Sequence, residues 1–129
     1  MLVRILALLL CCSATLAGGA TLDEQLIGQW RSERGSIITF GADHSYVDRG
    51  QGVVRIGTWH TRGHRLTTAT KSPPDPTEYI NTCDVLLRGD EFCFGMCEHV
   101  QRLHGNTSKP ELYTTGVVYK RLRHSYQHI

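Results

Sequence analysis

The sequence predicts a single all-β domain, either a sandwich or a barrel, and three observations support this. Short runs rich in β-branched and aromatic residues recur at a spacing of about 8–12 residues. Glycine-bearing turns separate these runs, as at 41–44, 49–52, 61–64 and 88–91. Helical periodicity is confined to residues 21–27, where Thr21 is expected to cap a helical turn and Glu24 follows three positions later, as in a capping box.

Eight strands are expected along the chain, and they are assigned to residues 27–32, 36–40, 45–49, 53–60, 65–70, 78–88, 91–97 and 112–122. The proline-rich stretch 71–76 cannot be a central strand, because proline has no N–H to donate. Each side of it holds only about fifty residues, too few for an independent core. We therefore expect a long loop inside one domain.

The first twenty residues resemble a secretory signal peptide. Arg4 gives a positive start, residues 5–12 are uniformly apolar, and small residues precede Ala20. Cleavage is expected after residue 20, followed by a barrel or sandwich domain at 21–123 and a polar tail at 124–129. Export to the periplasm or the extracellular space follows from this. A membrane anchor, or lipid modification at Cys11 or Cys12, stays open.

Composition excludes several classes of protein. The chain has 129 residues, 14 Lys+Arg against 12 Asp+Glu, and 20% charged residues. This balance does not fit a disordered tail, a coiled coil or a polytopic membrane protein. No basic stretch is dense enough for a nucleic-acid footprint. We expect a monomer with no nucleic-acid partner and no stable membrane insertion.

Two Gly-x-Trp triplets, at 28–30 and 57–59, flank a hairpin-like Thr-Phe-Gly-Ala-Asp-His-Ser-Tyr segment at 39–46. This arrangement resembles the small secreted lipocalin-like β-barrel proteins of bacteria, mainly over residues 26–70. No Thr-Asp-Tyr loop motif accompanies it. The resemblance implies an antiparallel up-and-down barrel of about eight strands that holds a small apolar molecule. The expected ligand-binding wall residues are Trp30, Phe40, Tyr46, Trp59, Leu66 and Tyr79.

The same resemblance implies a structural role for a basic residue of the last strand. In lipocalins such a residue packs across the tryptophan of the first strand, so Arg121 or Arg123 is expected within about 6 Å of the Trp30 ring. Gly28 and Gly57 are expected to let a neighbouring backbone or ring approach closely.

Three cysteines, Cys83, Cys93 and Cys97, lie beyond the expected cleavage site. If residues 89–91 form the loop of a hairpin, Cys83 lies opposite Cys97 and Leu87 opposite Cys93. All three thiols then share one face, because side chains alternate along a strand. We predict a Cys83–Cys97 disulfide, with Cys93 free.

Segment 93–99 also has the soft ligands that Cu(I) prefers, in Cys93, Met96, Cys97 and His99. Strand alternation puts Met96 on the face opposite the other three, so no metal site is expected. His60 and His64 are expected to flank an Arg62-Gly63 turn and to be solvated.

No nucleophile elbow, zinc-peptidase helix or phosphate-binding loop is present. Nothing in the spacing of Cys93 and His99 enforces a thiolate pair. We therefore expect a non-enzymatic, cofactor-free binding protein for a small apolar molecule. The alternative is a protein-interaction module, such as a periplasmic inhibitor or immunity-type protein, that uses loops near Arg62, 71–76 and 103–110. Soft-metal handling is the third hypothesis.

Overall fold

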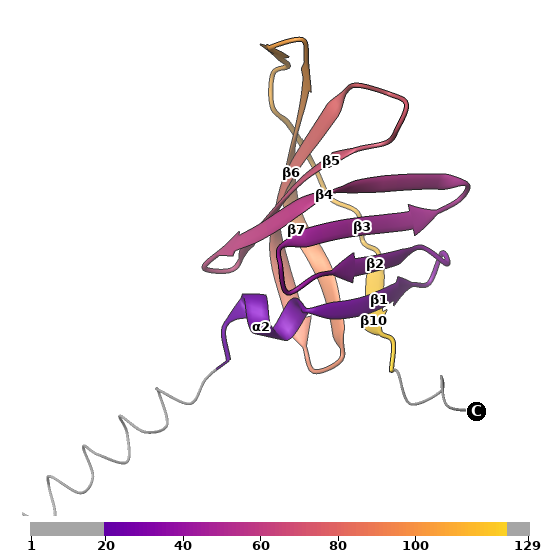
Figure 1. Ribbon diagram of the computed structural model, residues 1–129. Coiled ribbons are helices and arrows are strands. Elements are labelled where there is room, and N and C mark those ends of the chain that lie inside the picture. The colour runs from indigo at the N-terminus through magenta and orange to yellow at the C-terminus, as the bar shows by residue number, and fades with distance from the viewer. Residues whose placement is uncertain (1–19, 124–129) are drawn as a thin grey trace, which may run out of the picture.

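The computed structural model describes residues 20–123. One short helix precedes ten strands (Figure 1). The elements are α2 (Leu22–Leu26), β1 (Gly28–Ser32), β2 (Ile37–Phe40), β3 (Ser45–Gly50), β4 (Val53–Arg62), β5 (Arg65–Lys71), β6 (Glu78–Arg88), β7 (Glu91–Leu103), β8 (Asn106–Thr107), β9 (Glu111–Tyr113) and β10 (Val118–Arg121).

The strands form a closed antiparallel barrel, which confirms the all-β prediction and the up-and-down barrel of about eight strands implied by the resemblance. Strands β1 to β7 pair in sequence order, and β10 pairs with both β1 and β7. In these two pairings Trp30 lies opposite Arg121, and Cys93 lies opposite Val118. Eight strands therefore close the ring, while β8 and β9 lie along the far part of β7.

Helix α2 covers one end of the barrel (Figure 1). The Thr21 hydroxyl accepts a hydrogen bond from the Glu24 amide at 3.3 Å, which confirms the predicted cap. Leu26 is fully buried, and its carbonyl accepts a hydrogen bond of 2.8 Å from the Trp30 indole. The helix thus closes the barrel end and satisfies the buried indole N–H.

The interior at the α2 end is filled by side chains. Alternate strand residues point inward and form one cluster, made of Leu26, Trp30, Ile38, Phe40, Tyr46, Trp59, Leu66, Val85 and Phe92. Its rings meet edge to face, with centroid distances of 4.8 Å for Trp30–Phe92 and 5.1 Å for Phe40–Trp59. Such dense aromatic packing leaves the barrel a core at this end rather than a cavity.

Three strand and turn predictions were wrong in detail. The segment 112–122 forms two strands instead of one, interrupted at Gly116, whose φ of 64° does not suit an extended strand. Strand β7 continues beyond residue 97 to Leu103. The β4–β5 turn consists of Gly63 and His64, because Arg62 pairs with Arg65. Gly63 has φ 62°, as the first position of such a tight turn requires.

The β6–β7 register was correct at the disulfide and wrong beyond it. Cys83 lies opposite Cys97, but Leu87 faces Phe92 instead of Cys93. The turn has only two residues, Gly89 and Asp90, and an irregularity follows Cys83. The extra residue lies on β7. Phe94 and Cys97 are three positions apart on β7, whereas their partners Val85 and Cys83 are two positions apart on β6. Cys93 therefore does not share the face of the other two cysteines.

Candidate functional site

Five of the six predicted wall residues belong to the core. Trp30, Phe40, Trp59 and Leu66 are at most 2% exposed, and Tyr46 is buried with them. These side chains pack on one another, so they fill the interior at the α2 end rather than surround an empty space. The sixth, Tyr79, is half-buried at the opposite end, where its hydroxyl donates to Asp75 Oδ2 at 3.1 Å.

Arg121 lies over Trp30, as predicted. Its guanidinium carbon is 4.2 Å from the indole centroid, and Nη1 donates to the Ile27 carbonyl at 3.1 Å. Gly28, with φ 128°, makes room for this arginine, since a Cβ there would lie 3.3 Å from Nη1. A Cβ on Gly57 would lie 1.8 Å from the Ala69 carbonyl oxygen, so this position requires glycine. Both glycines therefore allow the close approaches expected of them.

The barrel end away from α2, here called the mouth, is lined by polar and aromatic side chains. The Arg55 guanidinium lies 5.4 Å from the Tyr79 centroid, and Tyr79 stacks on His99 at 5.9 Å. Asn81 Oδ1 contacts His99 Nδ1 at 2.8 Å and accepts from the Tyr113 hydroxyl at 2.9 Å. An amide oxygen only accepts, so this contact requires the proton on Nδ1 of His99.

Charge and burial oppose each other at the mouth. Burial raises the pKa of Asp48, and the opposing charge of Arg55 limits the rise. Burial also raises the pKa of Tyr113 and raises that of Tyr119 to about 12.

Asp48 and Arg55 line a hollow of about 220 Å³, and Arg55 has no ion pair within residues 20–123. This volume is below the roughly 300–1,000 Å³ that is typical of a small-molecule pocket.

A larger hollow, here called the helix groove, lies between α2, the β4–β5 turn and the β6–β7 hairpin. Its volume is about 770 Å³. Its apolar lining includes Leu22, Val85, Leu87 and Phe92, which also belong to the core cluster or pack against it. Its polar lining includes Gln25, His64, Arg88 and Glu91. None of the six predicted wall residues lines it.

One side of the helix groove is an open strand edge. The β5–β6 pairing ends where Arg65 meets Asp84, and the Val85 amide makes a last bond of 2.9 Å to the His64 carbonyl. Backbone groups alternate in direction along a strand, so the N–H and C=O of Leu87 face the same side. No strand of residues 20–123 pairs with that side of Leu87. The sequence analysis assigned a short strand to 65–70 and a longer one to 78–88, but it did not establish the β5–β6 register that leaves the end of β6 unpaired.

The cysteines confirm the predicted bridge. Cys83 and Cys97 form a disulfide with a Cα–Cα distance of 4.0 Å, and Cys93 is free and half-buried. Cys97 is thus not available as a thiolate ligand. Among residues 20–123 no three His, Cys, Asp or Glu side chains are grouped as a metal site would need. The described region also contains no helix long and apolar enough to cross a bilayer.

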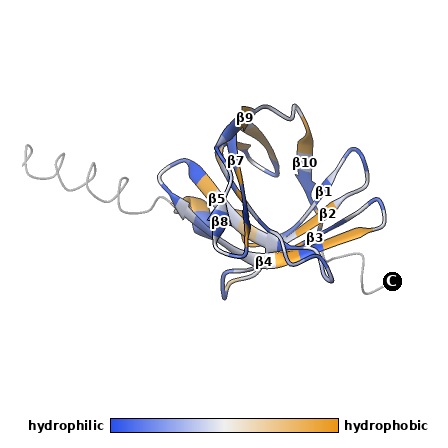
Figure 2. Ribbon diagram, turned by 90° about the horizontal axis from the view of Figure 1, so that it is seen from above, coloured by the Kyte–Doolittle hydropathy of each residue, from blue (hydrophilic) through white to orange (hydrophobic). Residues whose placement is uncertain are grey.

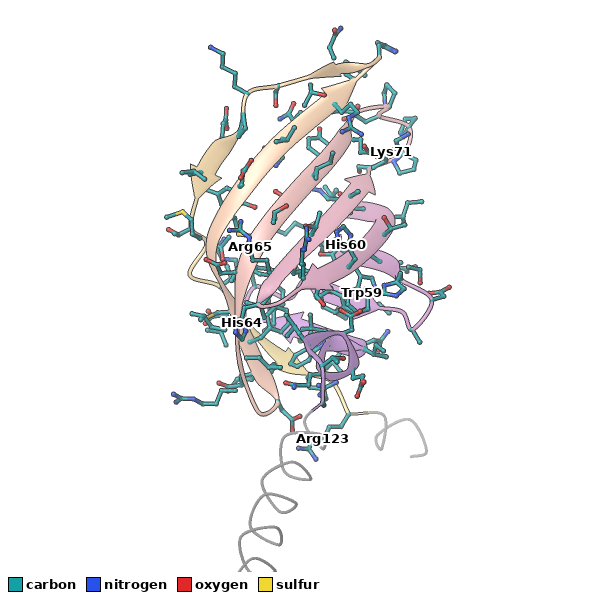
Figure 3. The ribbon with its side chains drawn as sticks, turned by 90° about the vertical axis from the view of Figure 1, so that its left-hand side faces the viewer. Trp59, His60, His64, Arg65, Lys71 and Arg123 are labelled. Atoms are coloured by element: carbon teal, nitrogen blue, oxygen red, sulfur yellow. A yellow bond between two sulfur atoms is a disulfide. The ribbon has the colours of Figure 1, made fainter. Side chains whose placement is uncertain are left out.

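The exposed candidates lie at two different ends. His60 on β4 and His64 in the β4–β5 turn are solvent-exposed, as predicted (Figure 3). Arg62 lies at this end, whereas the loop at 72–77 and the β7–β8 hairpin lie at the mouth (Figure 1). The register agrees, because Lys71 pairs with Glu78, and Glu78 with Arg102. The three loops proposed from sequence therefore do not form one surface.

No family of known proteins matches this chain, and no curated protein matches it. One similar solved structure is that of Pallilysin (Tp0751) from Treponema pallidum. It is 14% identical, with a TM-score of 0.55, over 93% of this chain and 95% of that one. The likeness at this identity shows the fold alone. The chain is an eight-stranded antiparallel β-barrel, consistent with the lipocalin-like barrel expected above.

Proposed function

We propose that this is an exported, non-enzymatic binding protein that holds an extended segment of a partner protein in the helix groove. The observation that carries the proposal is the open edge of β6 at Leu87 beside a hollow of about 770 Å³. A strand edge binds an extended chain through backbone hydrogen bonds, and adjacent hollows accept its side chains. The core at the α2 end is filled, which favours binding at the surface of the barrel.

The groove is chemically suited to such a segment. Leu22, Val85, Leu87 and Phe92 offer an apolar floor, while Arg88 and Glu91 offer one charge of each sign at the rim. An alternating segment with apolar residues inward and polar residues outward would satisfy both. The partner that we expect is a secreted or periplasmic enzyme, for which this chain acts as an inhibitor or immunity protein.

A small apolar molecule in the same groove is the second candidate. The groove volume lies within the range of roughly 300–1,000 Å³ typical of small-molecule sites. This keeps the expected ligand class and moves it from the barrel interior to the helix-covered end. The open strand edge has no role in this alternative, which is why we rank it second.

Native mass spectrometry of protein purified after export distinguishes the two candidates. A retained polypeptide supports the first, and a retained small molecule supports the second. A Gln25→Trp variant, which fills the groove from its rim, should lose the bound species. The matched Thr58→Trp variant, on the outer wall of β4, should keep it. Retention of the same species by both variants would exclude the groove as the site.

A further inference from the structure

The outward positions of β1 to β4 contain no acidic residue. Because Trp30, Ile38, Phe40, Tyr46 and Trp59 are buried, the residues alternating with them face outward. These outward positions are occupied by Gln29, Arg31, Ile37, Thr39, Ser45, Val47, Arg49, Val54, Ile56, Thr58, His60 and Arg62. Of the acidic residues between 29 and 62, Asp48 on β3 faces inward, and Glu33 and Asp43 lie in turns. A chain with 14 basic and 12 acidic residues thus concentrates one sign of charge on one wall.

Strand register places the cations and the aliphatic residues of this wall side by side. One row runs from Arg31 through Ile37 and Arg49 to Val54. The next row runs from Val47 through Ile56 to Lys71 on β5. We call these seven residues the basic–apolar face, and Figure 2 shows hydrophobic colour along β3 and β4 in this region.

The face is partly exposed, and Glu78, which lies opposite Lys71 in the register, pairs with Arg102 instead. Val54 is 43% exposed and Ile56 is 46% exposed, on a hairpin that extends sideways from the barrel (Figure 1). Arg31, Arg49 and Lys71 have no ion pair within residues 20–123. Unpaired cations also occur elsewhere, as at Arg62 and Lys109, but on this face they lie beside exposed aliphatic side chains. Exposed aliphatic side chains next to unpaired cations indicate a partner that is itself anionic and partly apolar.

We infer that the basic–apolar face docks on a bilayer surface rich in anionic phospholipid. Cations near such a surface are attracted to the headgroups, and aliphatic side chains bury shallowly beneath them. The apolar members of the face are all aliphatic, whereas the apolar anchors of protein interfaces are mainly Trp and Tyr in well-packed pockets. As the outer side of a barrel wall it also fits a deformable lipid surface better than a second rigid protein.

Vesicle flotation tests the inference with the full chain as purified after export. The protein should bind vesicles containing phosphatidylglycerol, bind those of pure phosphatidylcholine weakly, and dissociate at high salt. An Arg31→Gln/Arg49→Gln double variant should lose about five-fold in partition coefficient for each charge, as follows from ~1 kcal/mol per cation. An Ile56→Ser variant should also bind more weakly.

The control variant is Arg88→Gln/Lys109→Gln, which removes the same number of charges away from the wall of β1 to β4. Neither residue is ion-paired within the described chain, so folding should be unaffected. Equal losses in the two double variants would mean that net charge alone governs binding and would overturn the face as the site. Failure of the unmodified protein to bind phosphatidylglycerol vesicles would overturn the inference altogether, and an acidic protein would then be the partner to seek. All variants carry the same N-terminus, so any leader left in place cannot cause a difference.

Discussion

Arg121 lies across Trp30, with its guanidinium carbon 4.2 Å from the indole centroid, and the two residues are direct partners in the β10–β1 pairing. The arginine also donates to backbone carbonyls near the end of α2 and to Asp90 in the β6–β7 turn. One side chain therefore joins the first strand, the last strand, the helix and a hairpin turn.

Replacing Arg121 by alanine should lower the free energy of unfolding by about 2–4 kcal/mol, since a cation–π contact and charge-assisted hydrogen bonds are lost together. The free energy of unfolding of Arg121→Lys should lie between those of the unmodified protein and Arg121→Ala, because lysine keeps the charge but lacks the planar guanidinium group. Arg123→Ala serves as the control, since its pair with Asp90 is largely exposed. Urea denaturation monitored by tryptophan fluorescence measures all three. Equal losses for Arg121→Ala and Arg123→Ala would contradict the structural role of Arg121.

Reduction of the Cys83–Cys97 disulfide should destabilise the barrel by about 2–3 kcal/mol, since the bridge closes a short loop. The sequence separation of the two cysteines is 14. Cys93→Ala should change stability much less, because that thiol is unbridged. Denaturation curves with and without reductant test this. A similar response to reductant in a Cys83→Ala/Cys97→Ala variant would argue against the bridge.

The stability of the protein should depend on the ionisation of Asp48. Burial raises the pKa of this carboxyl above its ordinary value of 3.8 in the folded state. The folded form therefore binds the proton more tightly, and the free energy of unfolding falls as pH rises through the window between the unfolded and folded pKa values. Asp48→Asn should remove this loss. The free energy of unfolding of the variant, relative to that of the unmodified protein, should therefore increase from acid to neutral pH.

Urea titrations at several pH values measure the effect of Asp48→Asn, and carbon NMR of the Asp48 carboxyl gives its pKa directly. Arg55→Gln should raise that pKa further, because the Arg55 charge is what limits the rise. An Asp48 pKa at or below the ordinary value would contradict the buried placement of this side chain.

Gly57→Ala should be among the most damaging single substitutions in the sheet. The added methyl group would overlap the backbone of Ala69 and Thr70 on β5, and backbone cannot rotate away as a side chain can. We expect a loss of about 3 kcal/mol or more, at the upper end of overpacking effects. Gly89→Ala, where a methyl group meets open space at φ 59°, should cost only about 1–2 kcal/mol. Thermal melts of the two variants provide the comparison.

Local patterns predicted much of the barrel. Alternation around the two tryptophans identified the inward faces. The Cys83–Cys97 pairing was predicted from a turn that is one residue too long, and the extra residue on β7 offsets that difference. The register beyond Cys83 was not predictable by counting, because the β7 irregularity lies at Gly95, where a Cβ would come within 3.2 Å of Asp84. That contact lies between two strands, so it cannot be detected from the hydrophobic periodicity of either strand.

The candidate surfaces were less predictable than the fold. The helix groove joins Leu22, His64 and Phe92, which are far apart in the sequence and come together through the β5–β6 register and the placement of α2. The basic–apolar face, in contrast, has a signal in the sequence. Once the buried tryptophans fix which positions face inward, the absence of acidic residues at the outward positions between 29 and 62 can be counted directly.

Strand β10 is the last strand of residues 20–123 in chain order, yet it fills the gap between β1 and β7. Until it arrives, both of those strands present unsatisfied edges to other chains in the same compartment. Ring closure must therefore wait until β10 is available, and folding should be slow and dominated by contacts between residues far apart in the sequence. During that interval the open edges make the partly folded chain prone to aggregation.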